Sequence, residues 1–248
     1  MITLSPERLL NFLEQWQQVR PPALFQNKPA IKPLAPGKLA AFCSLWQHYQ
    51  PLAAQNALFF DPWDIAGLAR KEVQNTTVLA WLLNPLGSHG FGDIMLNTLM
   101  AELSLRSAGQ LPAYYGEYCR VNVEVCPSGD TSNRVDLVVD AHTFYLLVEV
   151  KIDAAEQYEQ LSRYAQEANI CAGQRPWAVL FLTPHGCVGS TIGESTEKNR
   201  HLSLSWYELS RLLWPVLRGY RQDIQYKSPQ RHMAEQSATC FIRRMMQF

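Results

Sequence analysis

Charged residues inside two short apolar runs constrain the fold of this chain more than any other feature. The segment 134–151 reads RVDLVVDAHTFYLLVEVK, with Asp136 in the first run and Glu149 and Lys151 at the end of the second. Charges surrounded by apolar residues are costly to bury unless another group compensates them. The three charged residues therefore call for a common explanation.

The alternation within this segment predicts two strands, 134–139 and 143–151, joined by the turn DAH. Side chains alternate between the two faces of a strand, so Glu149 and Lys151 share a face while the valines beside them point into the core. If the strands pair in the antiparallel direction, Asp136 comes next to Glu149. Two carboxylates and one ammonium then meet at one end of the hairpin.

This grouping has two interpretations. Carboxylate oxygens are the ligands that Mg²⁺ prefers, and a nearby lysine is suited to orient a water molecule or to stabilise negative charge on a phosphate. In the alternative interpretation, the three residues form an ion-pair cluster on a solvated face. The short D…E-x-K pattern alone favours this alternative. The strongly apolar strands around the charges favour the metal site.

The remainder of the chain predicts helices and strands that alternate, which indicates an α/β fold with a mixed sheet flanked by helices. Further strands are expected at 118–127, 177–184 and the start of 201–220. Helices are expected at 5–19, 38–54, 64–83, 94–109, 153–170, the remainder of 201–220 and 228–248.

Residues 1–60 form a predicted helical N-terminal extension, and 61–248 form the predicted main domain. Ser5 and Pro6 are typical of a helix start, whereas the proline-rich stretch 21–37 is typical of a surface connector. No internal repeat connects the two parts.

Composition places the chain among globular proteins with a substantial core, since 47% of its residues are hydrophobic and 18% charged. No secretory signal and no membrane span are recognisable, so we expect a soluble, cytoplasmic protein. The cysteines contain no C-x-x-C pair, which favours reduced, mostly buried thiols over a zinc site. They are Cys43, Cys119, Cys126, Cys171, Cys187 and Cys240.

The formal net charge is zero, but the charges are unevenly distributed. From Lys198 to Phe248 the chain has nine basic and three acidic residues. A basic region of this kind is either a phosphate-binding face or a solvated helix surface, and charge alone does not separate the two.

The spacing of the three charged residues carries a family resemblance. Asp136, then twelve residues, then Glu149-Val150-Lys151 resembles the signature of the PD-(D/E)XK nuclease superfamily. Val135 stands where the family has a proline, a departure that leaves the metal ligands intact. The resemblance implies a restriction-endonuclease-like mixed central sheet.

Further residues over about 64–215 extend this resemblance. In the predicted helix 153–170, Gln160 and Tyr164 lie four apart on one face and resemble the Q-x-x-x-Y element of the exonuclease-like branch. Upstream, Glu72 followed by LLNP and HG is similar to the start of one bacterial subgroup, and Arg134 matches that subgroup's Arg-x-Asp pattern.

The resemblance implies a nuclease that hydrolyses DNA with Mg²⁺, for which Mn²⁺ substitutes. In it Asp136, Glu149, the backbone carbonyl of Val150 and Glu72 hold the metal, and Lys151 positions or activates water. Gln160 and Tyr164 then orient the scissile strand. It further implies a bacterial protein of antiviral defence, with a possible activating protein encoded separately.

Two rival functions stay open: a catalytically inactive nuclease-fold protein that binds DNA or serves as a scaffold, and a nuclease directed at RNA. Several other residues have a structural and a functional interpretation. Glu124 is either an outward-facing strand residue, which we favour, or a further metal ligand. His89 either organises a loop, which we favour, or contacts phosphate, and His185 and His201 are expected to be structural.

Overall fold

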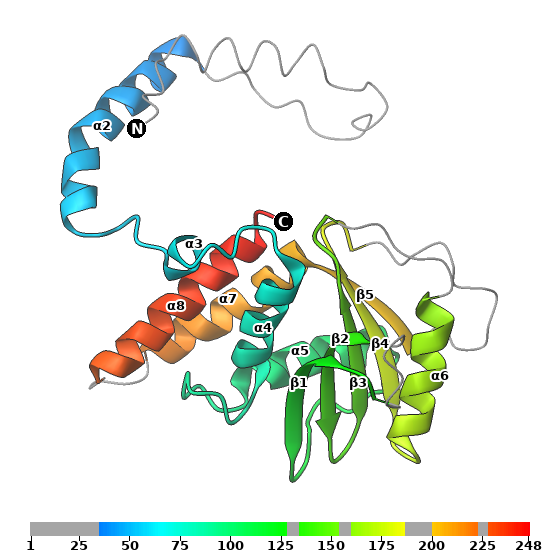
Figure 1. The fold of residues 1–248 in the computed structure, drawn as a ribbon. Helices are drawn as coiled ribbons and strands as arrows, with labels where there is room; N and C mark the ends of the chain where they lie inside the picture. Colours follow the sequence, from blue (N-terminus) through cyan, green and yellow to red (C-terminus); the bar gives the residue numbers. More distant parts are fainter. Residues whose placement is uncertain (1–34, 128–133, 154–159, 187–199, 223–227) are drawn as a thin grey trace, which may run out of the picture. The chain divides into compact units, whose positions relative to one another are not determined.

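The computed structural model describes residues 35–127, 134–153, 160–186, 200–222 and 228–248 (Figure 1). The expected helix at the start of the chain lies outside these residues. Among those that are described, no helix is long and apolar enough to cross a membrane.

A five-stranded mixed sheet is the centre of the main body. Its strands lie in the order of the sequence: β1 (Cys119–Val125), β2 (Val135–Ala141), β3 (Tyr145–Val150), β4 (Trp177–Thr183) and β5 (His201–Ser205). The first three strands pair in the antiparallel direction, and β3, β4 and β5 pair in the parallel direction. The predicted α/β fold with a mixed sheet is thus confirmed.

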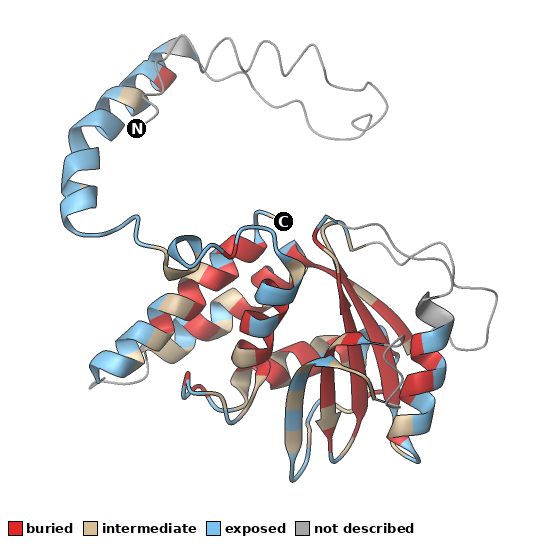
Figure 2. Cartoon of the chain, viewed as in Figure 1, coloured by how far each residue is buried: buried red, intermediate tan, exposed pale blue. Residues whose placement is uncertain are grey.

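Helices cover both faces of this sheet (Figure 1). One face packs against helices that share a large apolar core with it, and the other packs against α6 (Gln160–Ala172). The helices of the first face are α4 (Glu72–Leu83), α5 (Ile94–Arg106), α7 (Trp206–Gln222) and α8 (Pro229–Met245). Because both faces are covered, every residue of β3 is buried, including Glu149 (Figure 2).

The prediction of a single helix over 64–83 is wrong. A short helix, α3 (Pro62–Ile65), ends well before α4 begins at Glu72. Between them Gly67 and Ala69 have positive φ angles of 69° and 42°, which a continuous helix does not accommodate. The carbonyl of Ala69 accepts hydrogen bonds from Arg244 and Asn75, so a contact from the far end of the chain stabilises the break.

Residues 35–60 belong to a separate compact unit and are considered by themselves. They contain α2 (Pro36–Gln55), which continues through Pro51. Its aromatic side chains contact one another, with Phe42 stacked on Trp46 at 6.5 Å and Trp46 tilted against Phe59 at 5.8 Å between ring centroids.

The cysteines are less buried than expected. Those within the described residues are free thiols, each of intermediate exposure. Cys187 lies outside the described residues.

Candidate functional site

Asp136 and Glu149 lie side by side at one end of the sheet. The antiparallel register pairs Leu137 with Val148, which brings the preceding Asp136 opposite the following Glu149. The backbone N–H of Val150 donates to Oδ2 of Asp136 at 2.9 Å. The carboxylate thus accepts a hydrogen bond that a backbone carbonyl of the neighbouring strand would accept in a regular sheet. The N–H and C=O groups of one strand residue point toward the same neighbouring strand. We therefore expect the Val150 carbonyl to point toward β2 and Asp136 as well.

Lys151 follows directly after β3 and contacts the same cluster. Its Nζ lies 2.5 Å from Oε1 of Glu149. The backbone is held on two sides, because the Lys151 N–H donates to the carbonyl of Leu182 and the indole N–H of Trp206 donates to the carbonyl of Lys151. These two hydrogen bonds fix the backbone position of Lys151 at the end of the sheet.

The ionisation of the three groups is set by burial and by their mutual charges. Burial raises the pKa of Asp136, and burial together with the charge of Asp136 raises the pKa of Glu149, which is 1% exposed. Burial alone lowers the pKa of Lys151, but the contact with Glu149 and the charges of Asp136 and Glu72 together outweigh burial, so the lysine pKa is raised. Lys151 is therefore a stable cation, whereas the two carboxylates share a site that disfavours both charges.

Tyr164 of α6 also reaches this cluster. It is 4% exposed, its hydroxyl donates to the carbonyl of Arg134 at 3.0 Å, and it interacts with the side chain of Glu149. Gln160 is the first residue of α6, and its side chain lies outside the described residues. The structure thus brings one of the two predicted helix residues to the carboxylates.

Glu72, at the start of α4, contacts the backbone that follows Lys151. Its Oε1 accepts hydrogen bonds from the N–H groups of Ile152 at 2.9 Å and Asp153 at 3.3 Å. Its charge acts on both Asp136 and Lys151, so it lies at the cluster. Oε1 of Glu72 therefore holds the backbone directly after Lys151.

Sequence reasoning missed two residues that support the site. Arg70 donates from Nε to both carboxylate oxygens of Asp153 and from a terminal nitrogen to the carbonyl of Ile152. Trp206 holds the carbonyl of Lys151 from the first position of α7. Arg70 stands two positions before Glu72, which is a weak signal, and no sequence pattern connects Trp206 with Lys151.

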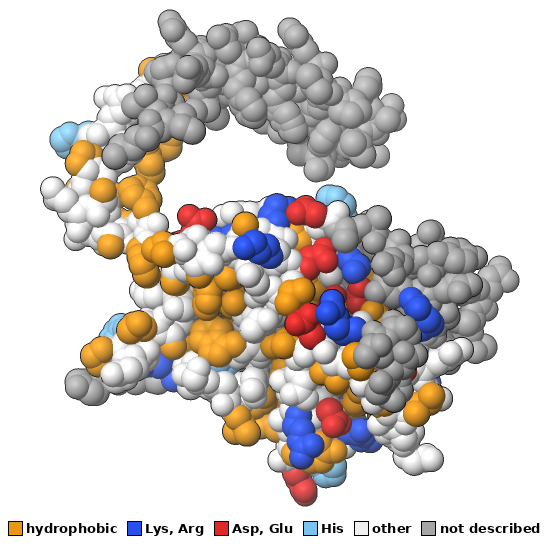
Figure 3. Space-filling model, in the orientation of Figure 1, with side chains coloured by type: hydrophobic (Ala, Val, Ile, Leu, Met, Phe, Trp, Pro, Cys, Tyr) orange, Lys and Arg blue, Asp and Glu red, His pale blue; other side chains and the backbone are white. Residues whose placement is uncertain are grey.

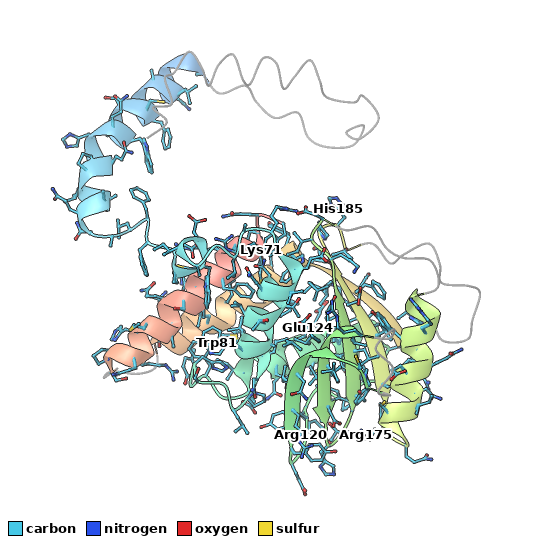
Figure 4. All side chains as sticks on the ribbon, viewed as in Figure 1. Lys71, Trp81, Arg120, Glu124, Arg175 and His185 are labelled. Carbon is cyan, nitrogen blue, oxygen red and sulfur yellow. The ribbon has the colours of Figure 1, made fainter. Side chains whose placement is uncertain are left out.

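His89 hydrogen-bonds within its own loop. His89 is 1% exposed; its Nδ1 accepts from the N–H of Phe91, so Nε2 carries the proton and donates to the carbonyl of Asn84. This agrees with the favoured loop role. His201 is buried on β5, whereas His185 is exposed just beyond β4, at the same end of the body as Lys71 (Figure 4).

The basic C-terminal region divides into two kinds of arginine. Arg244 is 9% exposed and contacts Asp61 and Asp64 at 3.5 Å, so it is a structural residue. In contrast, Arg243 is exposed and lies over the ring of Trp214 at 5.4 Å. Arg211 and Arg218 are also exposed on α7, and within the described part of the chain neither forms an ion pair.

An open depression of about 490 Å³ adjoins the cluster at the start of α4. Acidic and basic side chains lie next to one another at this end of the body (Figure 3). The depression is lined by Arg70, Lys71, Glu72, Val73, Gln74 and Asp153. Glu72 and Asp153 connect it to the backbone that follows Lys151, whereas Asp136 and Glu149 do not line it.

The two carboxylates and the lysine fit a magnesium site better than a site with many protein ligands. Within the described residues, no group of three or more histidine, cysteine, aspartate or glutamate side chains converges as a metal cage would. Mg²⁺ is usually held by one or two carboxylates, with waters and substrate phosphate as its other ligands. Asp136 and Glu149, whose negative charges oppose each other, match that donor set.

Comparison with known proteins gives a family. A search of curated proteins and a search of solved structures found no significant match. Residues 59–236 match the family model described as the PD-(D/E)XK nuclease superfamily. The matched region contains the whole sheet, both carboxylates, Lys151 and Tyr164. The chain belongs to the PD-(D/E)XK nuclease superfamily.

Proposed function

We propose that this protein is a Mg²⁺-dependent nuclease that hydrolyses phosphodiester bonds in DNA, with residues 61–248 as its nuclease domain. The observation that carries the proposal is the pair of adjacent carboxylates, the half-buried Asp136 and the buried Glu149, with Lys151 in contact with Glu149 at the end of the sheet. Neighbouring carboxylates of which one is buried are unfavourable for stability, and groups of this kind cluster at functional sites.

Asp136, Glu149 and the carbonyl of Val150 are the groups that would hold the metal, with Mn²⁺ as a substitute. When bound, the ion would lower the pKa of a water molecule and offset the charge on the phosphate. Glu72 either joins these ligands or serves only the backbone after Lys151. Glu72→Gln keeps an acceptor for both backbone N–H groups, so retained cleavage indicates the backbone role and lost cleavage the metal role.

Lys151 acts as a cation in this proposal. The contact with Glu149 keeps its ammonium protonated at neutral pH, so it is a poor proton acceptor. A fixed ammonium is suited to orient the attacking water and to stabilise the charge that develops on the phosphate. Its backbone hydrogen bonds to Leu182 and Trp206 hold it in place for this role.

The substrate strand is proposed to lie beside α6, with Tyr164 and Gln160 orienting it. Exposed Arg211, Arg218 and Arg243 are candidates for contacts with the flanking DNA backbone, whereas the buried Arg244 is not. Cytoplasmic location, a role in bacterial antiviral defence and a separate activating protein belong to the same proposal through the family.

Two alternatives make different predictions. An inactive nuclease-fold protein that binds DNA or serves as a scaffold would bind no Mg²⁺ at the carboxylates. An RNA-directed nuclease would keep the same metal chemistry and differ in substrate. The three intact residues Asp136, Glu149 and Lys151 favour an active enzyme.

The test is a substrate panel. The purified protein is incubated with plasmid, linear duplex, single-stranded DNA and RNA in the presence of Mg²⁺ or Mn²⁺, beside Lys151→Ala. Metal-dependent DNA cleavage that the variant lacks supports the proposal, and cleavage of RNA alone supports the RNA-directed alternative. If neither protein cleaves any substrate and calorimetry detects no Mg²⁺ binding, the inactive alternative holds.

A further inference from the structure

Glu124 has a strained backbone in the interior of a strand. Its φ angle is 50°, in the left-handed region that residues with a side chain seldom adopt. The ladder continues on both sides, from Val123 paired with Leu137 to Val125 paired with Val135, so no inserted residue or turn accounts for the conformation. Glu124 thus lies opposite Asp136, at the other end of β1 from Arg120 (Figure 4).

The strain accompanies an ion pair that is itself of little value for stability. Oε1 of Glu124 lies 3.1 Å from a terminal nitrogen of Arg134. The two side chains are 40% and 55% exposed, and ion pairs this exposed contribute little to folding. A strained residue that stability does not explain points to a function for the pair.

Arg134 is well placed for such a function. It stands two residues before Asp136, and its backbone carbonyl is held by the hydroxyl of Tyr164. Its guanidinium has five donors, and within the described residues its side chain contacts only Glu124. The planar fork of an arginine matches two phosphate oxygens, which a lysine does not achieve.

We propose that Arg134 binds a backbone phosphate of the nucleic-acid substrate beside the carboxylates, and that Glu124 is a positioning residue that orients its guanidinium. This inference rests on the proposed nuclease function and adds a substrate contact to it. The strained backbone of Glu124 directs its carboxylate toward Arg134, leaving the outer donors of the guanidinium for the ligand.

The experiment compares Arg134→Ala, Arg134→Lys, Glu124→Gln and the double variant Arg134→Ala/Glu124→Gln with the wild type. Cleavage of a labelled DNA duplex is measured with Mg²⁺, and binding of a labelled oligonucleotide is measured by anisotropy at several salt concentrations in a Lys151→Ala background. We expect Arg134→Ala to lower kcat/KM about 10- to 100-fold, mainly through KM, and to reduce the salt slope of binding by about one.

The remaining variants separate a positioning role from a merely structural one. Arg134→Lys should recover part of the loss. Glu124→Gln should lower kcat/KM about three- to tenfold alone and have no further effect in the Arg134→Ala background, because it acts through the arginine. Glu124→Gly should raise Tm by a few degrees through relief of strain while it lowers cleavage.

Equal kcat/KM and equal salt slopes in wild type and Arg134→Ala would overturn the inference, as would losses that simply add in the double variant. In either case wild-type cleavage leaves the proposed function intact. If the wild type cleaves nothing, binding still decides: a slope reduced by Arg134→Ala supports the phosphate contact, and an unchanged slope or absent binding overturns it.

Discussion

Each end of strand β2 has an aspartate near a cation, but the two ends differ in how the charges are paired. Asp136 and Asp140 lie four residues apart, so their side chains share a face of the sheet. Each is near a cation, Lys151 at one end and Arg175 at the other. The end of β2 near Arg175 also lies farthest from Lys71 and His185 (Figure 4).

The Arg175 end has its hydrogen bonds satisfied. Arg175 contacts Asp140 at 2.7 Å, donates to the carbonyls of Ala141, Cys171 and Ala172, and lies over the ring of Tyr145. One carboxylate thus meets a cation whose other donors bind fixed backbone groups. Such an arrangement stabilises the turn between β2 and β3 against α6.

The Lys151 end has two carboxylates, the half-buried Asp136 and the buried Glu149, beside one lysine. Burial and the charge of Asp136 raise the pKa of Glu149, and Lys151 contacts only Glu149 directly. The difference teaches that residue type does not separate a structural ion pair from a reactive site. In the proposed function, the number of carboxylates for each cation and the burial of Glu149 separate them.

The largest expected effect is the loss of cleavage at the Lys151 end alone. Lys151→Ala should lower kcat/KM by about 10²- to 10³-fold, because it removes the cation that we propose acts on the reacting phosphate. Asp140→Asn is the matched control and should cleave at the wild-type rate. Initial rates on labelled duplex DNA measure both, and a comparable loss in Asp140→Asn would erase the proposed distinction.

The next effect is on stability, at the other end. Arg175→Ala should lower the free energy of unfolding by about 2–3 kcal/mol, since Asp140 and the carbonyls lose their donor while partial exposure limits the cost. Urea denaturation measures the change, with Arg175→Lys expected in between. Cleavage per folded molecule should stay at the wild-type level; a loss there would show that Arg175 serves catalysis.

A smaller effect separates the ends by metal binding. With 10 mM Mg²⁺ and a Kd of about 1 mM, the Tm of the wild type should rise by about 3 °C, because the ion binds the folded state alone. Asp136→Asn should show no shift and Asp140→Asn the full shift in thermal scanning. A shift that survives Asp136→Asn would place the metal elsewhere.

The smallest effect concerns pH. The pKa values of Asp136 and Glu149 lie above those of ordinary carboxyl groups, so protons should compete with Mg²⁺ at a higher pH than usual. Below these raised pKa values, kcat/KM should fall about tenfold per pH unit. Because folding raises these pKa values, ionisation destabilises the metal-free protein as pH rises, and Asp136→Asn should be at least as stable at neutral pH. A pH profile with the acid limb of ordinary carboxyl groups would contradict both.

Local sequence predicted the hairpin well. The strands expected at 134–139 and 143–151 are found at Val135–Ala141 and Tyr145–Val150, because alternation and a polar turn are local signals. The break before α4 was not predictable, since the contact that stabilises it comes from Arg244, 175 residues away from Ala69. The contact of Glu72 with Ile152, across 80 residues, was equally hidden.

By itself the sequence determined which groups lie together at the proposed site: two carboxylates and a lysine at a spacing that strand alternation places together. Only the tertiary structure decided their state. Helices on both faces of the sheet bury Glu149, and Trp206 and Glu72 hold the backbone around Lys151 from elements distant in the chain. Burial and charge act through space, so the raised pKa values of Asp136 and Glu149 have no counterpart in the local sequence.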